Sequence, residues 1–244
     1  FKMTCLIIKS EIEINQWLNQ YINLSQRMLD NYDAVVEDVI SKVKENGDEA
    51  LINFTYKFDN IKLKRDSLFF SQEEINKSSA KVSRQEKESL KLAASRIKKY
   101  HKKQMPRNKF WKDEMGVELG YRWTPINSIG IYVPSNLPSS LLMNAIPARL
   151  AKIKNIYLSN PRIKSKLDPA VMYAAKKCGI KPSRIISVGG AQAIGHLAYI
   201  DKCSKIVGPG NLYVASAKKI VSDDVGTESI LAGPSEVTVI ADKF

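Results

Sequence analysis

Three polar side chains in the second half of this 244-residue chain stand at turns suited to binding an anionic or nucleotide ligand: Tyr132, Gln192 and Asn211. Each belongs to a segment that runs from a short apolar strand into a Gly/Pro-rich turn opening a helix, namely Gly130–Ser140, Ile185–Ala193 and Ile206–Leu212. Such turns place backbone N–H groups and helix N-termini at one edge of a parallel sheet, where α/β proteins bind anions and nucleotides. The pattern therefore predicts a nucleotide or anion site at these turns.

Each of these residues also has a purely structural interpretation. Glycine by itself permits a tight turn between a strand and a helix. Tyr132 fits a half-buried strand aromatic as well as a ring that stacks on a base, and Asn211 fits an ordinary Asx turn. The Gly189-Gly190-Ala191-Gln192 turn is not the GxGxxG dinucleotide fingerprint, so taken alone it is weak support for a cofactor.

A fourth turn, Ala232–Glu236, presents Ser235 and Glu236 just before the last predicted strand. These side chains either hydrogen-bond a polar substrate or cap the turn. No Ser/His/Asp set and no close carboxylate pair can be assembled by spacing, and the two histidines, His101 and His196, have no metal ligand at a usable spacing. We therefore assign no catalytic residue and no metal ligand from the pattern.

The composition indicates a globular protein of a reducing cytoplasm. The net charge is +13, and the stretch Arg96–Lys112 gathers basic residues around Tyr100, His101, Phe110 and Trp111. A solvated helix face followed by a loop explains this stretch better than nucleic-acid binding does, so no nucleic-acid partner is expected. Three widely separated cysteines favour a reducing compartment, and no transmembrane run or signal peptide is visible, so no membrane partner is expected.

The elements that must position these turns follow from hydrophobic periodicity. The first half is predicted to be mostly helical, with an apolar stripe that runs from Val35 to Val43 and capping boxes at Ser71–Glu74 and Ser83–Glu86. From Ser128 the pattern alternates between strands and helices, which predicts a parallel sheet with right-handed crossovers. The predicted strands are Val117–Trp123 and then Ile129–Val133, Ile156–Ser159, Ile185–Val188, Ser204–Val207 and Val237–Ala241. The expected fold class is α/β, with a helical N-terminal half and a parallel-sheet, incomplete Rossmann-like domain.

Several motifs resemble those of the histidinol dehydrogenase family. The resemblance covers most of the chain, with weaker agreement at Tyr56–Asp59, and its specific blocks are Arg122–Pro125, Gly130–Pro134, Pro138–Ala148, Val188–Ile194, Lys205–Ala215 and Ala232–Val237. It implies an NAD-dependent, zinc-dependent oxidation of L-histidinol to L-histidine through histidinal, in a cytoplasmic homodimer. It also implies that Tyr132, Gln192 and Asn211 contact NAD and that Ser235 contacts the substrate.

The resemblance further implies how the chain divides into domains. Residues 1–125 would form the helical part of one Rossmann-like domain, residues 126–233 an NAD-binding-type domain, and residues 234–244 a strand that returns to the first domain. The family's zinc ligands and its Glu-His acid/base pair match nothing in this sequence, which stops after the Gly-Pro-Ser-Glu block. We therefore expect a truncated, inactive homologue, or alternatively a non-catalytic remnant that keeps nucleotide affinity or a dimer surface.

One departure from the family falls within the predicted cofactor site. Ser135 and Asn136 stand where the family has two glycines, and the turn is shorter before Pro138. Because side chains limit how closely a backbone approaches a ligand, this turn is expected to be more constrained than in the family.

Overall fold

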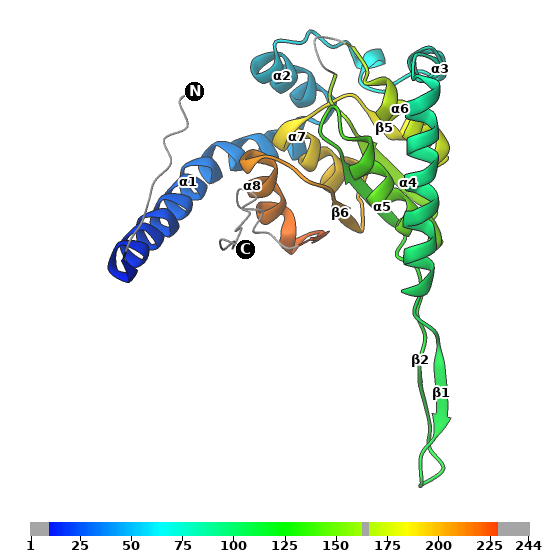
Figure 1. The fold of residues 1–244 in the computed structure, drawn as a ribbon. Coiled ribbons are helices and arrows are strands. Elements are labelled where there is room, and N and C mark those ends of the chain that lie inside the picture. Colours follow the sequence, from blue (N-terminus) through cyan, green and yellow to red (C-terminus); the bar gives the residue numbers. More distant parts are fainter. Residues whose placement is uncertain (1–9, 163–165, 229–244) are drawn as a thin grey trace, which may run out of the picture.

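A five-stranded, fully parallel sheet forms the centre of the molecule. The computed structural model describes residues 10–162 and 166–228. Its central strands are β3 (Ser128–Tyr132), β4 (Asn155–Ser159), β5 (Ile185–Ile186), β6 (Lys205–Val207) and β7 (Gly226–Thr227). They lie in the order β5-β4-β3-β6-β7, so the direction of winding reverses between β3 and β6 (Figure 1). This is the order of doubly wound nucleotide-binding sheets, which bind ligands at such a reversal.

Helices cover both faces of the sheet. On one face lie α5 (Pro138–Leu150) and α6 (Pro169–Lys177), and on the other lie α7 (Gly190–Gly195) and α8 (Leu212–Ile220). Strand β3 is buried along its whole length, with Ile131 packed in one core and Tyr132 in the other. A sheet that is apolar on both faces needs helices on both, so the run of buried strands explains the three-layer arrangement.

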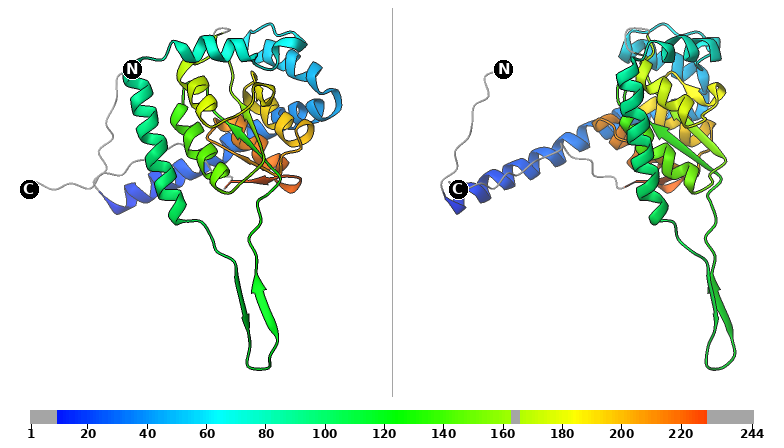
Figure 2. Two further views of the ribbon diagram at one scale, coloured as in Figure 1. Left: turned by 90° about the vertical axis from the view of Figure 1, so that its right-hand side faces the viewer. Right: turned by 45° about the vertical axis from the view of Figure 1, so that its right-hand side comes forward.

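The helices of the first half form an outer layer on each side. Helices α1 (Glu11–Asn46) and α2 (Asp48–Asp59) pack over α7 and α8, whereas α3 (Gln72–Ala80) and α4 (Arg84–Lys103) pack over α6 and α5 (Figures 1 and 2). The predicted capping boxes are confirmed: the hydroxyls of Ser71 and Ser83 accept hydrogen bonds from the backbone N–H groups of Glu74 and Glu86, whose carboxylates bond back.

Polar contacts fix α1 against α8 in addition to the apolar stripe. The hydroxyl of Ser216 donates to one oxygen of Asp33 at 2.5 Å, and the ammonium of Lys219 lies 2.8 Å from the other. The hydrogen bonds from Lys219 and Ser216 hold the pKa of Asp33 below its usual value. The carboxylate is therefore charged at neutral pH, and the contact anchors the middle of the long helix.

Two parts of the chain extend away from the body. The antiparallel strands β1 (Lys109–Lys112) and β2 (Glu118–Tyr121) form a hairpin arm, and the N-terminal half of α1 projects on another side (Figures 1 and 2). The basic stretch that the sequence assigns to a helix and a loop ends in β1 of this arm. Within the described part of the chain, no helix combines the length and apolarity needed to cross a bilayer.

The predicted strands agree with the structure where it describes them. Strands β1 and β7 were not predicted, and the predicted strand Val237–Ala241 lies outside the described residues, as does Ser235. Short 3₁₀ turns at Arg65–Ser67, Pro182–Arg184 and Val221–Asp223 and a π turn at His196–Ile200 complete the fold. The division into residues 1–125, 126–233 and 234–244 stays a prediction.

The turn after β6 passes directly over the end of β3. Gly208 has a φ of +113°, and a Cβ atom at this position would lie 1.9 Å from the carbonyl oxygen of Tyr132. A contact this short with backbone cannot be relieved by rotating a side chain. Only glycine therefore allows the two strand ends to approach as they do.

We predict that Gly208→Ala lowers the free energy of unfolding by about 3–5 kcal/mol, because either the turn or β3 must move. Gly116→Ala is the matched control: Gly116 also has a positive φ, of +81°, but no atom lies within 4 Å of the added methyl group. This control should cost about 1 kcal/mol. Urea denaturation of both variants measures the difference, and equal losses would contradict the close-approach argument.

Candidate functional site

A cavity of about 370 Å³ lies at the carboxyl ends of the strands on the α7 and α8 side. Four strand ends contribute to its lining: Tyr132 ends β3, Pro161 follows β4, Gly189 and Gly190 follow β5, and Asn211 follows β6. The cavity adjoins the reversal of strand order between β3 and β6. This is the position at which open α/β sheets bind their ligands.

The structure brings together the three residues that the sequence predicted for this site. Tyr132, Gln192 and Asn211, which are 79 positions apart from first to last, all line the cavity. Ser235, the fourth predicted contact, lies outside the described residues. The cavity therefore contains every predicted contact that the structure describes.

The Tyr132 side chain is buried, with 6% of its surface exposed. Its hydroxyl oxygen accepts a hydrogen bond from the backbone N–H of Gly190 at 3.4 Å. Burial raises the pKa of Tyr132, and the nearby charge of Asp59 raises it further, while the bond from Gly190 opposes both. The phenol is therefore neutral at physiological pH, and it keeps its own proton to donate.

Gln192 lies in the first turn of α7, with only 2% of its surface exposed. Its amide makes no hydrogen bond with any other described residue. The preceding Gly190 has a φ of +68°, and a Cβ there would come within 2.8 Å of the Gln192 side-chain oxygen. The glycine thus leaves room for a buried amide at the cavity wall, and buried amides normally have partners.

Asn211 is the N-cap of α8, and its side-chain oxygen accepts from the backbone N–H of Val214 at 3.1 Å. The structural interpretation of Asn211 is thus correct in part, because the residue both caps the helix and lines the cavity. Its NH₂ group is the part of the amide that remains for a ligand, since the oxygen is already engaged.

An ion pair holds the turn that carries Asn211. The carboxylate of Glu228 accepts from the backbone N–H of Gly208 at 2.9 Å and lies 2.5 Å from the ammonium of Lys218. Lys218 is buried and also donates to the carbonyl of Gly208. Both backbone groups of Gly208 are thereby satisfied, which fixes the turn over β3.

The outer wall of the cavity comes from the first half of the chain. Helix α1 contributes three valines of its apolar stripe, and α2 contributes Phe58 and Asp59; the remaining lining residues are Ala191 and Tyr213. Val35, the first residue of the predicted apolar stripe, is 48% exposed. Helical spacing alone gives such a stripe no role beyond packing, and the one signal toward the site was the weak family agreement at Tyr56–Asp59.

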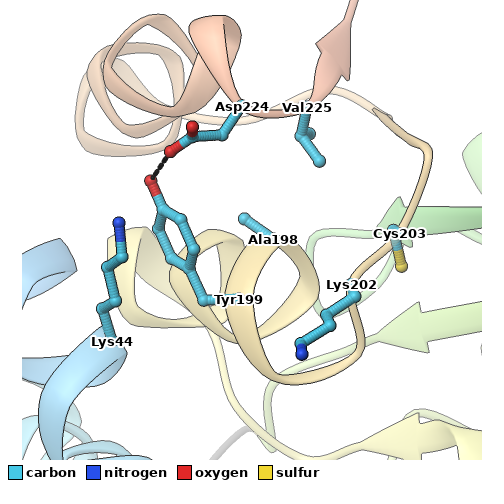
Figure 3. A pocket seen from close by; sticks show the side chains of 7 residues that line it. All are labelled: Lys44, Ala198, Tyr199, Lys202, Cys203, Asp224 and Val225. Carbon is cyan, nitrogen blue, oxygen red and sulfur yellow. Dashed lines mark hydrogen bonds between the residues drawn. The ribbon is translucent and has the colours of Figure 1, made fainter.

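A second hollow, of about 360 Å³, lies beside the π turn and is shown in Figure 3. The hydroxyl of Tyr199 donates to Asp224 at 2.7 Å, and the ammonium of Lys44 lies 4.5 Å from the Tyr199 ring centre. Burial and Asp224 raise the pKa of Tyr199 to about 12. These polar groups engage one another, and the ammonium groups of Lys44 and Lys202 lie on different sides of Tyr199, so the hollow gathers no set of groups toward a common ligand.

No metal centre is formed by the residues that the structure describes, since no three His, Cys, Asp or Glu side chains come together there. His196 is buried with its ring nitrogen 3.2 Å from Asp201, and His101 contacts the carbonyl of Ile97. Burial raises the pKa of Cys178 to about 11 and that of Cys203 further still, so both thiols stay protonated and unreactive.

Comparison with known proteins identifies relatives for the whole chain. The family model described as histidinol dehydrogenase matches residues 23–244. The chain is 41% identical to the histidinol dehydrogenase of Agrobacterium fabrum over 248 residues, which cover 99% of this chain and 57% of that protein. It is 46% identical to that of Cereibacter sphaeroides over 217 residues, covering 86% of this chain and 49% of that protein.

A solved structure gives the same result. The crystal structure of histidinol dehydrogenase from Elizabethkingia anophelis superposes with a TM-score of 0.78 at 39% identity, covering 83% of this chain and 48% of that one. The chain thus spans about half the length of the relatives that it matches. On these matches, and with the cavity at its parallel sheet, the chain belongs to the histidinol dehydrogenase family.

Proposed function

We propose that the cavity binds NAD, and that the chain represents the NAD-binding part of a cytoplasmic enzyme that oxidises L-histidinol to L-histidine through histidinal. The observation that carries this proposal is the convergence of Tyr132, Gln192 and Asn211 on one cavity beside the β3/β6 reversal. The comparisons support the family, and the family resemblance gives the reaction.

The groups at the cavity fit a dinucleotide. Tyr132 offers a neutral hydroxyl, and Gln192 and Asn211 offer amide groups, which suit ribose and amide hydrogen bonding. A Cβ at Gly189 would lie 2.8 Å from Pro161, so glycine keeps this side of the cavity open. The volume of about 370 Å³ falls within the range of roughly 300–1,000 Å³ typical of ligand sites.

Zinc does not fit the described residues, because they contain no cluster of metal ligands. The described residues therefore support no reaction step at a metal. The contact between Ser235 and the substrate is a proposal that follows from the family resemblance. Among the described residues, the cavity lining contains one carboxylate, that of Asp59, and no histidine, lysine or cysteine. An acid/base pair of the kind that alcohol oxidation needs is thus absent from the cavity lining.

The alternative function is that of a non-catalytic protein that keeps nucleotide affinity or a dimer surface. The specific observation that favours it is the same cavity lining, whose described residues offer groups to bind a nucleotide but no acid/base pair for the oxidation. Both candidates predict NAD binding, and neither predicts turnover by the 244-residue chain alone.

We predict saturable binding of NAD to the purified 244-residue chain in titration calorimetry. Gln192→Met preserves the volume of the buried side chain but removes its amide, and it should weaken binding about ten-fold. Gln85→Met, an exposed position on α4 beyond the opposite face of the sheet, is the matched control and should leave affinity unchanged.

Asn211→Asp provides a second test, because it keeps the capping oxygen but removes the NH₂ donors. It should weaken NAD binding at least about ten-fold without lowering the urea midpoint. Absence of NAD binding at millimolar concentration would sink the proposal for this cavity.

We expect the same sample to form no NADH on addition of histidinol, since the described lining offers one carboxylate and no acid/base pair for the oxidation. Absorbance at the NADH band, followed with and without added zinc, measures this directly. Histidinol-dependent turnover by the 244-residue chain would refute this expectation and exclude the non-catalytic alternative.

We also propose that the hairpin arm forms part of a homodimer interface. Paired positions in an antiparallel ladder share a face, so Trp111 lies beside Leu119 on the same face as Tyr121, with Trp123 next along the strand. The rings of Trp111 and Trp123 both contact Tyr121 edge-on, and these four side chains are between 42% and 61% exposed. An isolated hairpin with an exposed apolar face is marginal in water, so a partner that covers this face would stabilise it.

We predict that the wild-type chain sediments as a dimer at micromolar concentration and that Trp111→Ser with Tyr121→Ser sediments as a monomer. Phe110→Ser is the control on the opposite face of the same arm, where Phe110 is 69% exposed and lies over Gly120. It should leave the dimer intact. A monomeric wild type, or an unchanged dimer in the double variant, would contradict this role for the arm.

A further inference from the structure

Asp59 is the last residue of α2, and of the described residues that line the cavity it is the one that carries a carboxylate. The structure shows neither a hydrogen bond nor an ion pair from this carboxylate to any other described residue. Asp59 is exposed, but the protein atoms around its carboxyl group displace part of the water there, and this desolvation raises its pKa. Its charge acts on the hydroxyl of Tyr132, whose pKa it raises.

The position of Asp59 is unfavourable for the fold. The C-terminal end of a helix carries the negative end of the helix dipole, which disfavours a carboxylate there. At the opposite, N-terminal end of α2, Asp48 lies where the helix dipole favours a carboxylate, and it pairs with Arg65 at 3.0 Å. The Asp48 carboxylate therefore stabilises the fold, whereas the Asp59 carboxylate does not. We infer that Asp59 serves a ligand instead.

The described residues directly after the second strand of the sheet do not supply the acidic side chain that a doubly wound sheet commonly places there. In such sheets a carboxylate that bonds the ribose follows the second strand, which in this chain is β4. The residues after β4 are Asn160 and Pro161, and the Asn160 amide is buried and donates to the carbonyls of Val133 and Pro134. Residues 160–162, the described positions directly after β4, thus offer no carboxylate, whereas the helical half of the chain places Asp59 at the same cavity.

The chemistry around Asp59 selects the kind of group that it can bind. A carboxylate only accepts hydrogen bonds when charged, and it repels phosphate. Among the described residues that line the cavity, none is a lysine or arginine that could neutralise an added phosphate. We propose that Asp59 accepts hydrogen bonds from the ribose hydroxyls of the bound dinucleotide and excludes a dinucleotide that carries a 2′-phosphate. This inference rests on the proposed function and assigns a cofactor-specifying role to α2.

Calorimetric titration of the whole chain with NAD and with NADP tests the inference. We expect the wild type to bind NAD at least about ten-fold more tightly than NADP. We expect Asp59→Asn to lower this preference for NAD about ten-fold, mainly because the variant binds NADP more tightly. Glu49→Gln is the matched control, because it removes one exposed negative charge at the other end of the same helix. This control should leave the ratio as in the wild type.

The urea midpoint of Asp59→Asn provides a readout that a structural role would move. We expect it to be unchanged or higher, since the carboxylate opposes the helix dipole; a lower midpoint with an unchanged NAD/NADP ratio would overturn the inference and make Asp59 structural. An unchanged ratio in a normally stable variant that still binds NAD would overturn the inference alone. A wild type that binds neither dinucleotide would overturn the proposed function and the inference together.

Discussion

The close approach of the β6–α8 turn to the end of β3 is the constraint on which the site depends. Gly208 lies where any side chain would meet the carbonyl of Tyr132, and Lys218 and Glu228 satisfy both backbone groups of that glycine. Asn211 follows three residues later and begins α8, so its place beside Tyr132 is set by this contact. The cavity therefore depends on the close approach between the end of β3 and the turn after β6.

The two halves of the chain make different contributions to the cavity. The sheet domain supplies glycine turns, a neutral phenol and two amides, which are groups that recognise a ligand without carrying charge. The helical half supplies apolar side chains of α1 and the carboxylate of Asp59. Helix α1 is held against α8 by its buried valines and by the contacts of Asp33, and these contacts position the outer wall that α1 supplies.

Much of the fold could be predicted because its signals are local. The capping boxes at Ser71 and Ser83 and the apolar strands from Ile129 onward depend on neighbouring residues, and the structure confirms them. Strand β7 was missed since Gly226 and Thr227 are too few to give a periodic pattern, and they pair only because β6 presents an open edge. The exposure of Val35 was missed because helical spacing identifies a face and not what covers it.

The sequence by itself determined the α/β class, the family and three cavity residues, since glycine turns, capping residues and short apolar strands act over a few positions. Only the tertiary structure decided that these turns share one cavity and that α1 and α2 close it. The reason is physical: Asp59 and Tyr132 are far apart in the chain, and only packing of α2 over α7 brings a carboxylate from a helix end to the sheet edge. No local pattern records such a contact, because its free energy comes from apolar surface buried between distant segments.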